Sequence, residues 1–241
     1  MWVEECGGGL RIVPGESIFA ICNHFAYLCG GYMNKFCNKI SSFGWGVVAL
    51  YLVLCGLYFA PIAAPYKLVY PLALLTVASL RSRNPMLTVA LAFSALGDFF
   101  GATGVLILQI GAFAVTQICY LVVLGRQTAR HPLKHIALAA AVPVALCVVA
   151  LVAIVPAIEW GAIKVGAVLY ALLLGSMTTL AALAEGWCVK IGALMFMLSD
   201  FMLAHLIFVS PDAALLKVSL ALYFAGQLLL WLGLHSAKRR C

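Results

Sequence analysis

The run IALAAAVPVALCVVALVAIV, residues 136–155, carries no charge and shows no alternation of polar and apolar positions. A helix of about 20 apolar residues crosses the hydrocarbon core of a bilayer. Because lipid offers no partner to a backbone amide, only helices and closed barrels span it, and an unbroken apolar run indicates a helix rather than a strand. We therefore expect this segment to be a transmembrane helix.

Similar apolar runs recur along nearly the whole chain. Of its 241 residues, 65% are hydrophobic and 10% are charged, and the mean hydropathy is +1.10, whereas a soluble domain carries about 25% charged residues. So few charges cannot cover a surface that faces water. We predict an all-α, polytopic membrane helix bundle, which in a bacterium would lie in the inner membrane. Its spans, about eight in number, are expected near 44–60, 67–81, 85–101, 104–125, 134–156, 160–182, 188–209 and 212–235.

The basic residues fall mainly on one side of this layout. If the N-terminus is cytoplasmic, the outer side holds only Lys67, Lys164 and Lys217. The inner side then holds Lys35, Lys39, Arg81, Arg83, Arg126, Arg130, Lys134, Lys190, Lys238, Arg239 and Arg240. This asymmetry is the positive-inside bias, so we predict that both termini are cytoplasmic. It also accounts for the net charge of +7, and we expect the membrane, not a nucleic acid, as the partner.

Residues 1–32 differ from the rest of the chain. They contain three consecutive glycines and lack the basic start, apolar stretch and cleavage site of a secretory signal. Met33 is a more natural first residue for a chain that enters its first span soon afterwards. We interpret residues 1–32 as an atypical tail, either disordered or a start-site artefact, and residues 33–241 as a single transmembrane domain.

A short motif occurs twice, as ALGDFF at 95–100 and as MLSDFM at 197–202. Each copy is followed, in the next span, by an aromatic residue and a glutamine four positions apart, Phe113 with Gln117 and Tyr223 with Gln227. Two parallel repeats of four spans would explain this echo. A chance recurrence in an apolar chain would explain it too, and the sequence leaves both open.

Asp98 and Asp200 are the only acids inside the predicted spans, since the other six lie in the tail or at span boundaries. A carboxylate at membrane depth is costly, so such residues usually face the interior of a bundle and serve a function. Both spans run in the same direction, so the two acids can meet. Two close carboxyls in a low dielectric do not both ionise, which leaves one acid and one carboxylate. The alternative is a hydrogen-bonded pair that only joins helices.

Polar residues near the two acids are candidate contacts. Ser94 lies four positions before Asp98 and therefore shares its helix face. Gln117 and Tyr120 share a face of the fourth span, and a buried glutamine is costly without partners. For Gln117, a structural bond between helices is as reasonable as a contact to substrate.

No metal site is predicted. His205 lies five positions after Asp200, which is about 140° around a helix, so we do not expect these two side chains to pair. The nine cysteines form no Cys-x-x-Cys pair, and the histidines form no cluster with the spacing of metal ligands.

Four motifs in order along the chain carry a resemblance to a known family. They are Phe93 to Asp98; Gly111-Ala112-Phe113 with Gln117 and Tyr120; Gly192-Ala193-Leu194 with Phe196 and Ser199-Asp200; and Tyr223 to Gln227. Together they resemble the YhhN family of integral membrane proteins, which includes the lysoplasmalogenases, over about residues 44–235. The resemblance implies an eight-helix hydrolase that needs no cofactor. It would cleave the vinyl ether bond of a lysoplasmalogen, a single-chain ether phospholipid, to a fatty aldehyde and a glycerophospho-base.

On this resemblance, Asp98 and Asp200 are the expected catalytic residues. A neutral aspartic acid can protonate the alkene carbon, and an ionised one can stabilise the oxocarbenium ion and activate water. The expected substrate-binding residues are Ser94, Gln117, Tyr120, Ser199, Tyr223, Gln227 and Lys67.

The chain departs from the family pattern at two places. The family usually has an Ala-His pair where this chain has Thr116-Gln117, and glutamine does not titrate, so a proton relay through that position is lost. The family's Lys-Pro is Tyr70-Pro71 here, with Lys67 one turn earlier. Lys67 can then meet a lipid phosphate, or it acts only as an anchor at the membrane interface.

Two other functions are compatible with these residues. A proton- or cation-coupled transporter would bind its ion at Asp98 and Asp200, and a lipid-binding member without activity would account for Gln117. A closed apolar cavity that reaches both aspartates would favour the hydrolase. A water-accessible path to both faces would favour the transporter.

Overall fold

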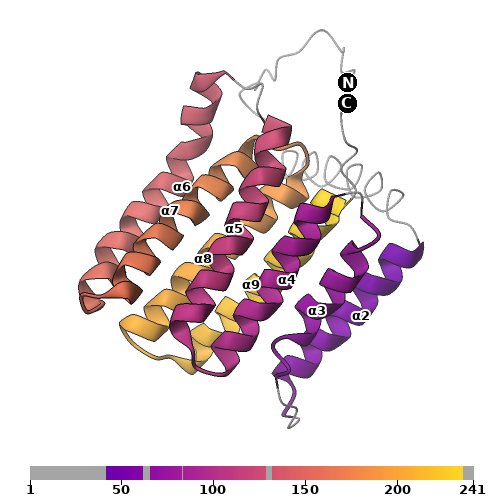
Figure 1. Ribbon diagram of the computed structural model, residues 1–241, viewed down its shortest axis with the longest axis horizontal. Coiled ribbons are helices and arrows are strands. Elements are labelled where there is room, and N and C mark those ends of the chain that lie inside the picture. The colour runs from indigo at the N-terminus through magenta and orange to yellow at the C-terminus, as the bar shows by residue number, and fades with distance from the viewer. Residues whose placement is uncertain (1–41, 62–65, 83, 129–131, 236–241) are drawn as a thin grey trace, which may run out of the picture. The chain divides into compact units, whose positions relative to one another are not determined.

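The structure, a computed structural model, describes residues 42–61, 66–82, 84–128 and 132–235, so the interpretation of residues 1–32 lies outside it. The described residues contain no strand and eight α-helices (Figure 1), which confirms the predicted all-α bundle. The helices are α2 (Ser42–Phe59), α3 (Tyr70–Ser79), α4 (Pro85–Ala102), α5 (Leu106–Thr128), α6 (Leu133–Ile154), α7 (Ala162–Leu183), α8 (Trp187–Phe208) and α9 (Ala213–His235), with a 3-10 turn, η1 (Val155–Ala157), after α6.

Six of the described helices, α4 to α9, are long and apolar enough to cross a membrane, which makes the chain a multi-pass membrane protein. The other two, α2 and α3, are shorter apolar helices. Helix α3 has only ten residues, or about 15 Å of length, half of a bilayer core. The predicted span 67–81 is longer than this helix, because residues 66–69 adopt a turn and Pro71 occupies the first turn of α3.

Prolines and glycines mark several of the breaks between helices. Pro85 opens α4 and Pro132 precedes α6, positions where a missing backbone N–H costs little. Gly104 and Gly186 have φ values of 76° and 97° in the turns before α5 and α8, a conformation that glycine adopts without strain. Pro143 departs from this pattern because it lies inside α6, which transmembrane helices tolerate better than soluble ones.

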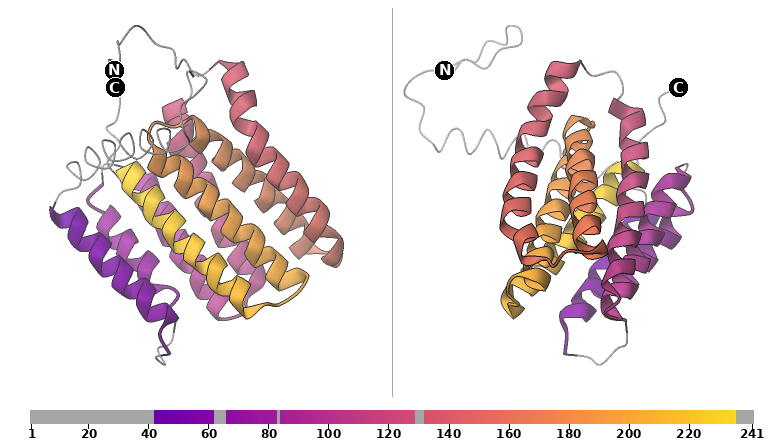
Figure 2. Two further views of the ribbon diagram at one scale, coloured as in Figure 1. Left: turned by 180° about the vertical axis from the view of Figure 1, so that it is seen from behind. Right: turned by 60° about the vertical axis from the view of Figure 1, so that its left-hand side comes forward.

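The helices pack in two corresponding halves. Helix α3 packs on α4 and α4 on α5, while α7 packs on α8 and α8 on α9. The halves meet through α5 with α7 and through α9 with α3. Figures 1 and 2 show α2 and α3 at one edge of this arrangement and α6 and α7 at the other. Two parallel repeats, α2–α5 and α6–α9, would produce this correspondence for α3–α5 and α7–α9, but α6 packs closely on α7, whereas α2 meets α9; a repeat and a chance recurrence of the motif therefore both stay open.

Helix α2 meets the bundle through side chains on α9. The hydroxyl of Tyr51 donates a hydrogen bond of 2.8 Å to the carbonyl of Phe224. The rings of Tyr51, Tyr58 and Phe59 also meet the ring of Phe224 edge-on, at centroid distances of 6.5, 5.7 and 6.4 Å. Aromatic edge contacts of this kind stabilise by about 0.5–1.5 kcal/mol each beyond the area they bury, so this cluster fixes α2 against α9.

The outer face of α6 is apolar. Leu138, Val149 and Val152 are 76%, 66% and 71% exposed. Water would disfavour so much exposed aliphatic surface on one helix, whereas lipid chains are a suitable solvent for it. This face is therefore a lipid-contacting surface.

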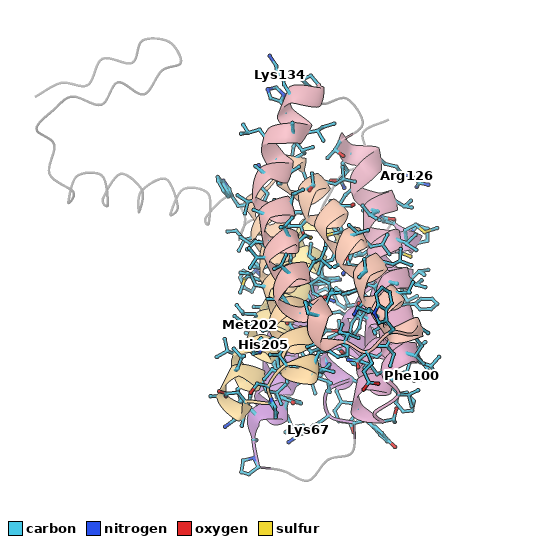
Figure 3. All side chains as sticks on the ribbon, turned by 90° about the vertical axis from the view of Figure 1, so that its left-hand side faces the viewer. Lys67, Phe100, Arg126, Lys134, Met202 and His205 are labelled. Atoms are coloured by element: carbon cyan, nitrogen blue, oxygen red, sulfur yellow. The ribbon has the colours of Figure 1, made fainter. Side chains whose placement is uncertain are left out.

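The two ends of the bundle carry the charges that the topology predicts. Figure 3 shows Lys67 at the same end as His205, and it shows Arg126 and Lys134 at the opposite end. This separation agrees with a layout in which Lys67 lies on one side of the membrane and the two other residues lie on the other side. That the arginine end faces the cytoplasm stays a prediction.

Asp212 precedes α9 and caps its first turn. Its Oδ1 accepts hydrogen bonds from the backbone amides of Leu215 (2.9 Å) and Ala214 (2.7 Å). Both bonds favour the charged carboxylate, and they lower the pKa of Asp212 below its ordinary value of 3.8. The cap also places a negative charge at the positive end of the α9 dipole.

We expect Asp212→Ala to lower the thermal unfolding midpoint of the purified protein at neutral pH, followed by circular dichroism. Because the folded-state pKa is depressed, the cap stabilises fully above the unfolded-state pKa, and this stabilisation is lost as the pH falls through the folded-state value. The difference between the two proteins should therefore vanish in acid. Asp212→Asn keeps the acceptor oxygen and should behave like the wild type at neutral pH. Equal midpoints for Asp212→Ala and the wild type at neutral pH would show that the cap is not stabilising.

Candidate active site

The two intramembrane aspartates lie in the C-terminal halves of α4 and α8. Figure 3 shows Phe100 and Met202, each two residues beyond one aspartate, toward the end of the bundle that carries Lys67. Both Asp98 and Asp200 border one cavity of about 390 Å³, which we call the wide cavity. The structure thus brings together the two acids that the sequence singled out.

The wide cavity is lined by residues from α2, the turn before α3, α4, α5, α8 and α9. Its polar lining consists of Tyr58, Tyr66, Lys67, Asp98, Gln109, Ser199, Asp200 and Tyr223. The ammonium of Lys67 donates a hydrogen bond of 3.0 Å to the carbonyl of Ala60 and lies 5.6 Å from the centre of the Tyr58 ring. The cavity therefore combines two carboxyls with one cation held at its wall.

Asp98 is almost completely buried, with 3% of its surface exposed. The hydroxyl of Tyr223 on α9 donates a hydrogen bond of 3.0 Å to its Oδ2. Tyr223 is itself held by aromatic contacts with Phe113 and Phe196, at centroid distances of 6.1 and 5.7 Å. A buried carboxyl needs such a partner, and here the partner's own position is fixed by packing.

Two glycines of α4 make room for side chains of α5 beside Asp98. A Cβ on Gly97 would lie 2.9 Å from the ring of Phe113, and one on Gly101 would lie 2.7 Å from the amide of Gln109. The small residues around Asp98 thus admit two side chains that line the cavity.

Asp200 is held by a different helix. The hydroxyl of Tyr170 on α7 donates a hydrogen bond to its Oδ2. The same hydroxyl accepts a hydrogen bond of 3.3 Å from Nε2 of Gln117 on α5, while Oε1 of Gln117 has no partner among the described residues. Gln117 therefore reaches Asp200 through one phenol.

Tyr170 was not predicted to belong to the site. The available signal was its place in the apolar segment of α7, since a buried phenol usually has a hydrogen-bond partner. Gln109 and Tyr58, which border the wide cavity, were also missed. Only the packing of the neighbouring helices shows that Gln109 and Tyr58 lie on the helix faces that border the cavity.

Three of the predicted substrate-binding residues form a buried network away from the wide cavity. Tyr120 donates a hydrogen bond of 2.8 Å to Oε1 of Gln227, and Nε2 of Gln227 donates one of 3.2 Å to Ser94. Ser94 donates in turn to Thr116, at 3.3 Å. Tyr120, Gln227, Ser94 and Thr116 are all fully buried. The hydrogen bonds within this network satisfy their polar groups, as burial requires.

The nine predicted site residues thus divide into two groups. Those that border the wide cavity are Lys67, Asp98, Ser199, Asp200 and Tyr223. Those that the structure places behind the cavity wall are Ser94, Gln117, Tyr120 and Gln227. Ser199 borders the cavity, but its hydroxyl lies 3.4 Å from that of Ser219, which also donates to the Ser199 carbonyl at 2.9 Å.

His205 takes no part in the site. It does not border the wide cavity, and its Nδ1 is buried without a hydrogen-bond partner in the described part of the chain. Across the described ranges, no group of three or more His, Cys, Asp or Glu side chains is placed to hold a metal ion. The titratable groups that border the wide cavity are therefore the two carboxyls, Lys67 and the phenols of Tyr58, Tyr66 and Tyr223.

This arrangement suits acid–base chemistry on an anionic amphiphile. A carboxyl pair in a confined, low-dielectric cavity can supply one proton donor and one carboxylate. Each phenol holds its carboxyl in one orientation, which favours proton transfer along a fixed direction. A lysine ammonium at the same cavity can bind a phosphate as a point charge.

Comparison with known proteins gave one match. A family model described as the YhhN family matches residues 62–234, more than half of the chain. The curated proteins and the solved structures compared with the chain gave no match. The matched range contains both aspartates, both phenol partners and Lys67.

Proposed function

The chain belongs to the YhhN family, and we propose that it is a membrane lipid hydrolase that cleaves the vinyl ether bond of a single-chain ether phospholipid. The observation that carries this proposal is the wide cavity, where two intramembrane carboxyls meet one lysine. Carboxyl pairs with divided roles are the recurring device of acid-catalysed hydrolysis at carbon–oxygen bonds.

The reaction is R–CH=CH–O–R′ + H₂O → R–CH₂–CHO + HO–R′. One carboxyl gives its proton to the alkene carbon, and the ether oxygen shares its electrons with the adjacent carbon to form an oxocarbenium ion. The second carboxyl, ionised, stabilises this cation and takes a proton from the water that adds to it. The hemiacetal hydroxyl then gives its proton to the first carboxylate as the bond to the glycerol oxygen breaks, and that oxygen takes the proton that the second carboxyl had accepted from water. The aldehyde is released and both carboxyls return to their starting states. Asp98 and Asp200 share these two roles.

Lys67 supplies the proposed contact to the head group. Its ammonium borders the same cavity as both carboxyls, and the Figure 3 view places it at the end of the bundle. Lipid phosphates lie at the membrane interface, which is where a snorkelling lysine places its charge. A lipid whose phosphate contacts Lys67 would extend its chain inward, past the aspartates.

The position of the cavity supports hydrolysis more than transport. All of its lining comes from the C-terminal halves of α2, α4 and α8, the N-terminal halves of α5 and α9, and the turn before α3. Toward the opposite end, the buried network around Tyr120 and Gln227 has no exposed surface, so no water-filled path continues through it. A carrier would need such a path, or a second conformation that opens one.

Gln117 supports retained activity. Its amide donates to the Tyr170 hydroxyl, which donates to Asp200. A glutamine here does not relay protons, but it orients the phenol that orients the carboxyl. The alternative of a lipid-binding protein without activity would be favoured if residue 117 made no connection to Asp200.

The proposal is tested with purified protein and lysoplasmenylethanolamine, with fatty aldehyde as the measured product. We expect aldehyde and glycerophosphoethanolamine in equal amounts, and no aldehyde from the corresponding saturated alkyl ether, which has no alkene to protonate. The transporter is tested in parallel by proton flux into liposomes that contain the protein. If several vinyl ether lysolipids give no aldehyde and the proton flux depends on Asp98 and Asp200, the hydrolase proposal is rejected in favour of a proton-coupled transporter.

Tyr170→Phe should lower kcat for aldehyde release by about 10- to 100-fold, because it removes a hydrogen bond to a charged group worth about 1.5–3 kcal/mol. KM should change little, since the phenol contacts the carboxyl and not the head group. Tyr120→Phe is the matched control: it also removes one buried phenol hydrogen bond, but from the network behind the cavity. If both variants lose activity only in proportion to the fraction of folded protein, Tyr170 has no role in positioning Asp200.

A further inference from the structure

A second, narrower cavity lies on the other side of Asp200. It has a volume of about 90 Å³ and is formed by α5, α6, η1, α7 and α8; we call it the narrow cleft. Five residues border both spaces: Gln109, Phe113, Asp200, Leu203 and Ile207. The two cavities are therefore neighbours that share one wall, and the Asp200 carboxyl belongs to that wall.

The lining of the narrow cleft is almost wholly apolar. Among its eighteen residues, the polar side chains are Gln109, Tyr170 and Asp200, and the last two are hydrogen-bonded to each other. Four alanines, Ala150, Ala167, Ala171 and Ala204, leave the space that larger side chains would fill. The lining contains no basic side chain that would bind a phosphate, whereas a hydrocarbon chain needs no polar partner.

The narrow cleft also lies where hydrocarbon is available. Its helices α5 to α8 are all candidate membrane spans. Ile207, which borders both cavities, is 43% exposed, so the shared wall reaches the surface of the bundle. A chain can therefore enter from the bilayer without crossing water.

We infer that the narrow cleft binds the hydrocarbon chain of the lipid substrate, while the wide cavity holds its glycerophospho head group. This inference rests on the proposed function, because it places the vinyl ether bond at Asp200, where the two spaces adjoin. The chemistry of the walls divides in the same way as the substrate, with a cation and two acids on one side and aliphatic side chains on the other. One narrow cleft accepts one chain, which accounts for a preference for single-chain over two-chain lipids.

The test narrows the cleft and compares substrates of different chain length. Ala167→Phe fills the cleft from α7. Leu169→Phe is the matched control on the same helix, since Leu169 is 56% exposed and does not line the cleft. For a hexadecenyl lysolipid, we expect Ala167→Phe to lower kcat/KM by about tenfold or more, since displacing a reacting group by 1 Å can cost about 10²-fold. For a butenyl lysolipid with the same head group, kcat/KM should be unchanged, and Leu169→Phe should affect neither substrate.

A second measurement does not depend on hydrolysis. A saturated lysophosphatidylethanolamine with a diazirine at the end of its chain is photolysed with the full-length protein, and labelled peptides are identified by mass spectrometry. We expect labels within 150–158 and 201–208 in the wild type and in Leu169→Phe, and their loss in Ala167→Phe and in Ala204→Phe.

The two measurements separate failure of this inference from failure of the proposed function. Labelling of the cleft without any hydrolysis would retain the chain site and reject the hydrolase. If Ala167→Phe hydrolyses the hexadecenyl lipid as fast as the wild type does, and the labels lie outside the cleft, the chain site is overturned and the hydrolase is retained. Equal loss on both chain lengths in a folded Ala167→Phe protein would also overturn the chain site, because the cleft would then act on catalysis and not on the chain.

Discussion

Asp98→Asn and Asp200→Asn should each reduce aldehyde release from a vinyl ether lysolipid by about 10³-fold, within the range of about 10²–10⁴-fold that a positioned acid or base contributes. Asparagine can neither donate the proton that starts the reaction nor carry the charge that stabilises the oxocarbenium ion. Both single variants should lose kcat with little change in KM, since neither carboxyl is needed to bind the head group. The double variant should release aldehyde no more slowly than the less active of the two single variants, because the two carboxyls act as a unit.

The controls for this experiment separate chemistry from folding. Asparagine keeps an oxygen that can accept the hydrogen bonds now made by Tyr223 and Tyr170, so both variants should elute and melt like the wild type. Asp212→Asn, which changes an exposed carboxyl in the loop before α9, should retain full activity. Substantial aldehyde release by either intramembrane variant would remove that aspartate from the mechanism.

Gly192→Ala and Gly226→Ala should each destabilise the bundle by about 1–3 kcal/mol or more, the cost of overpacking a close contact. A Cβ on Gly192 would lie 2.9 Å from the carbonyl oxygen of Gly226, and one on Gly226 would lie 2.9 Å from the carbonyl oxygen of Gly192. The obstructing atoms are backbone, so no rotamer change relieves the contact. Helices α8 and α9 would have to separate, and they carry Asp200 and Tyr223.

Thermal unfolding in detergent, compared with the wild type, measures this effect. Gly111→Ala is the matched control, because it lies in α5 and a Cβ there would meet nothing within 4 Å. That variant should be neutral or slightly stabilising, since alanine favours helix more than glycine does. If Gly192→Ala were as stable as Gly111→Ala, the close crossing of α8 and α9 would not be what holds them together.

The fold was largely predictable because apolar length is a local property. Seven of the eight predicted spans correspond closely to helices, α2 and α4 to α9. The span at 67–81 came out as the ten-residue α3, because hydropathy does not register that residues 66–69 form a turn. Pro143 lies inside the predicted span 134–156 and inside α6. At this position the apolar length of the segment predicted the helix correctly in spite of a proline in its interior.

The site was predictable in part. Asp98 and Asp200 could be identified because a carboxyl at membrane depth stands out in an apolar sequence. Tyr223 was also predicted as a site residue, but its bond to Asp98 was not, because it joins residues 125 positions apart and only helix packing decides which of several buried polar residues meet. The same holds for Gln227, which resembles a substrate contact in sequence but donates to Ser94, 133 positions away.

The two aspartates differ in the helices that supply their hydrogen-bond partners. Asp98 and Asp200 occupy corresponding helices of the two halves, yet their phenol partners do not correspond, since Tyr223 comes from α9 and Tyr170 from α7. The position in α5 that corresponds to Tyr223 is Phe113, which has no hydroxyl. The two carboxyls thus have different environments, which is what a division into proton donor and cation stabiliser requires.

Hydrolysis of a vinyl ether lysolipid in heavy water tests the central claim most directly. Protonation of the alkene carbon by an aspartic acid in exchange with solvent predicts one deuterium on the carbon next to the aldehyde group, found by mass spectrometry after immediate trapping of the aldehyde. The aldehyde incubated alone with the protein serves as the exchange control. Aldehyde that carries no deuterium from the wild-type reaction, or no aldehyde at all, would contradict acid-initiated cleavage at Asp98 and Asp200.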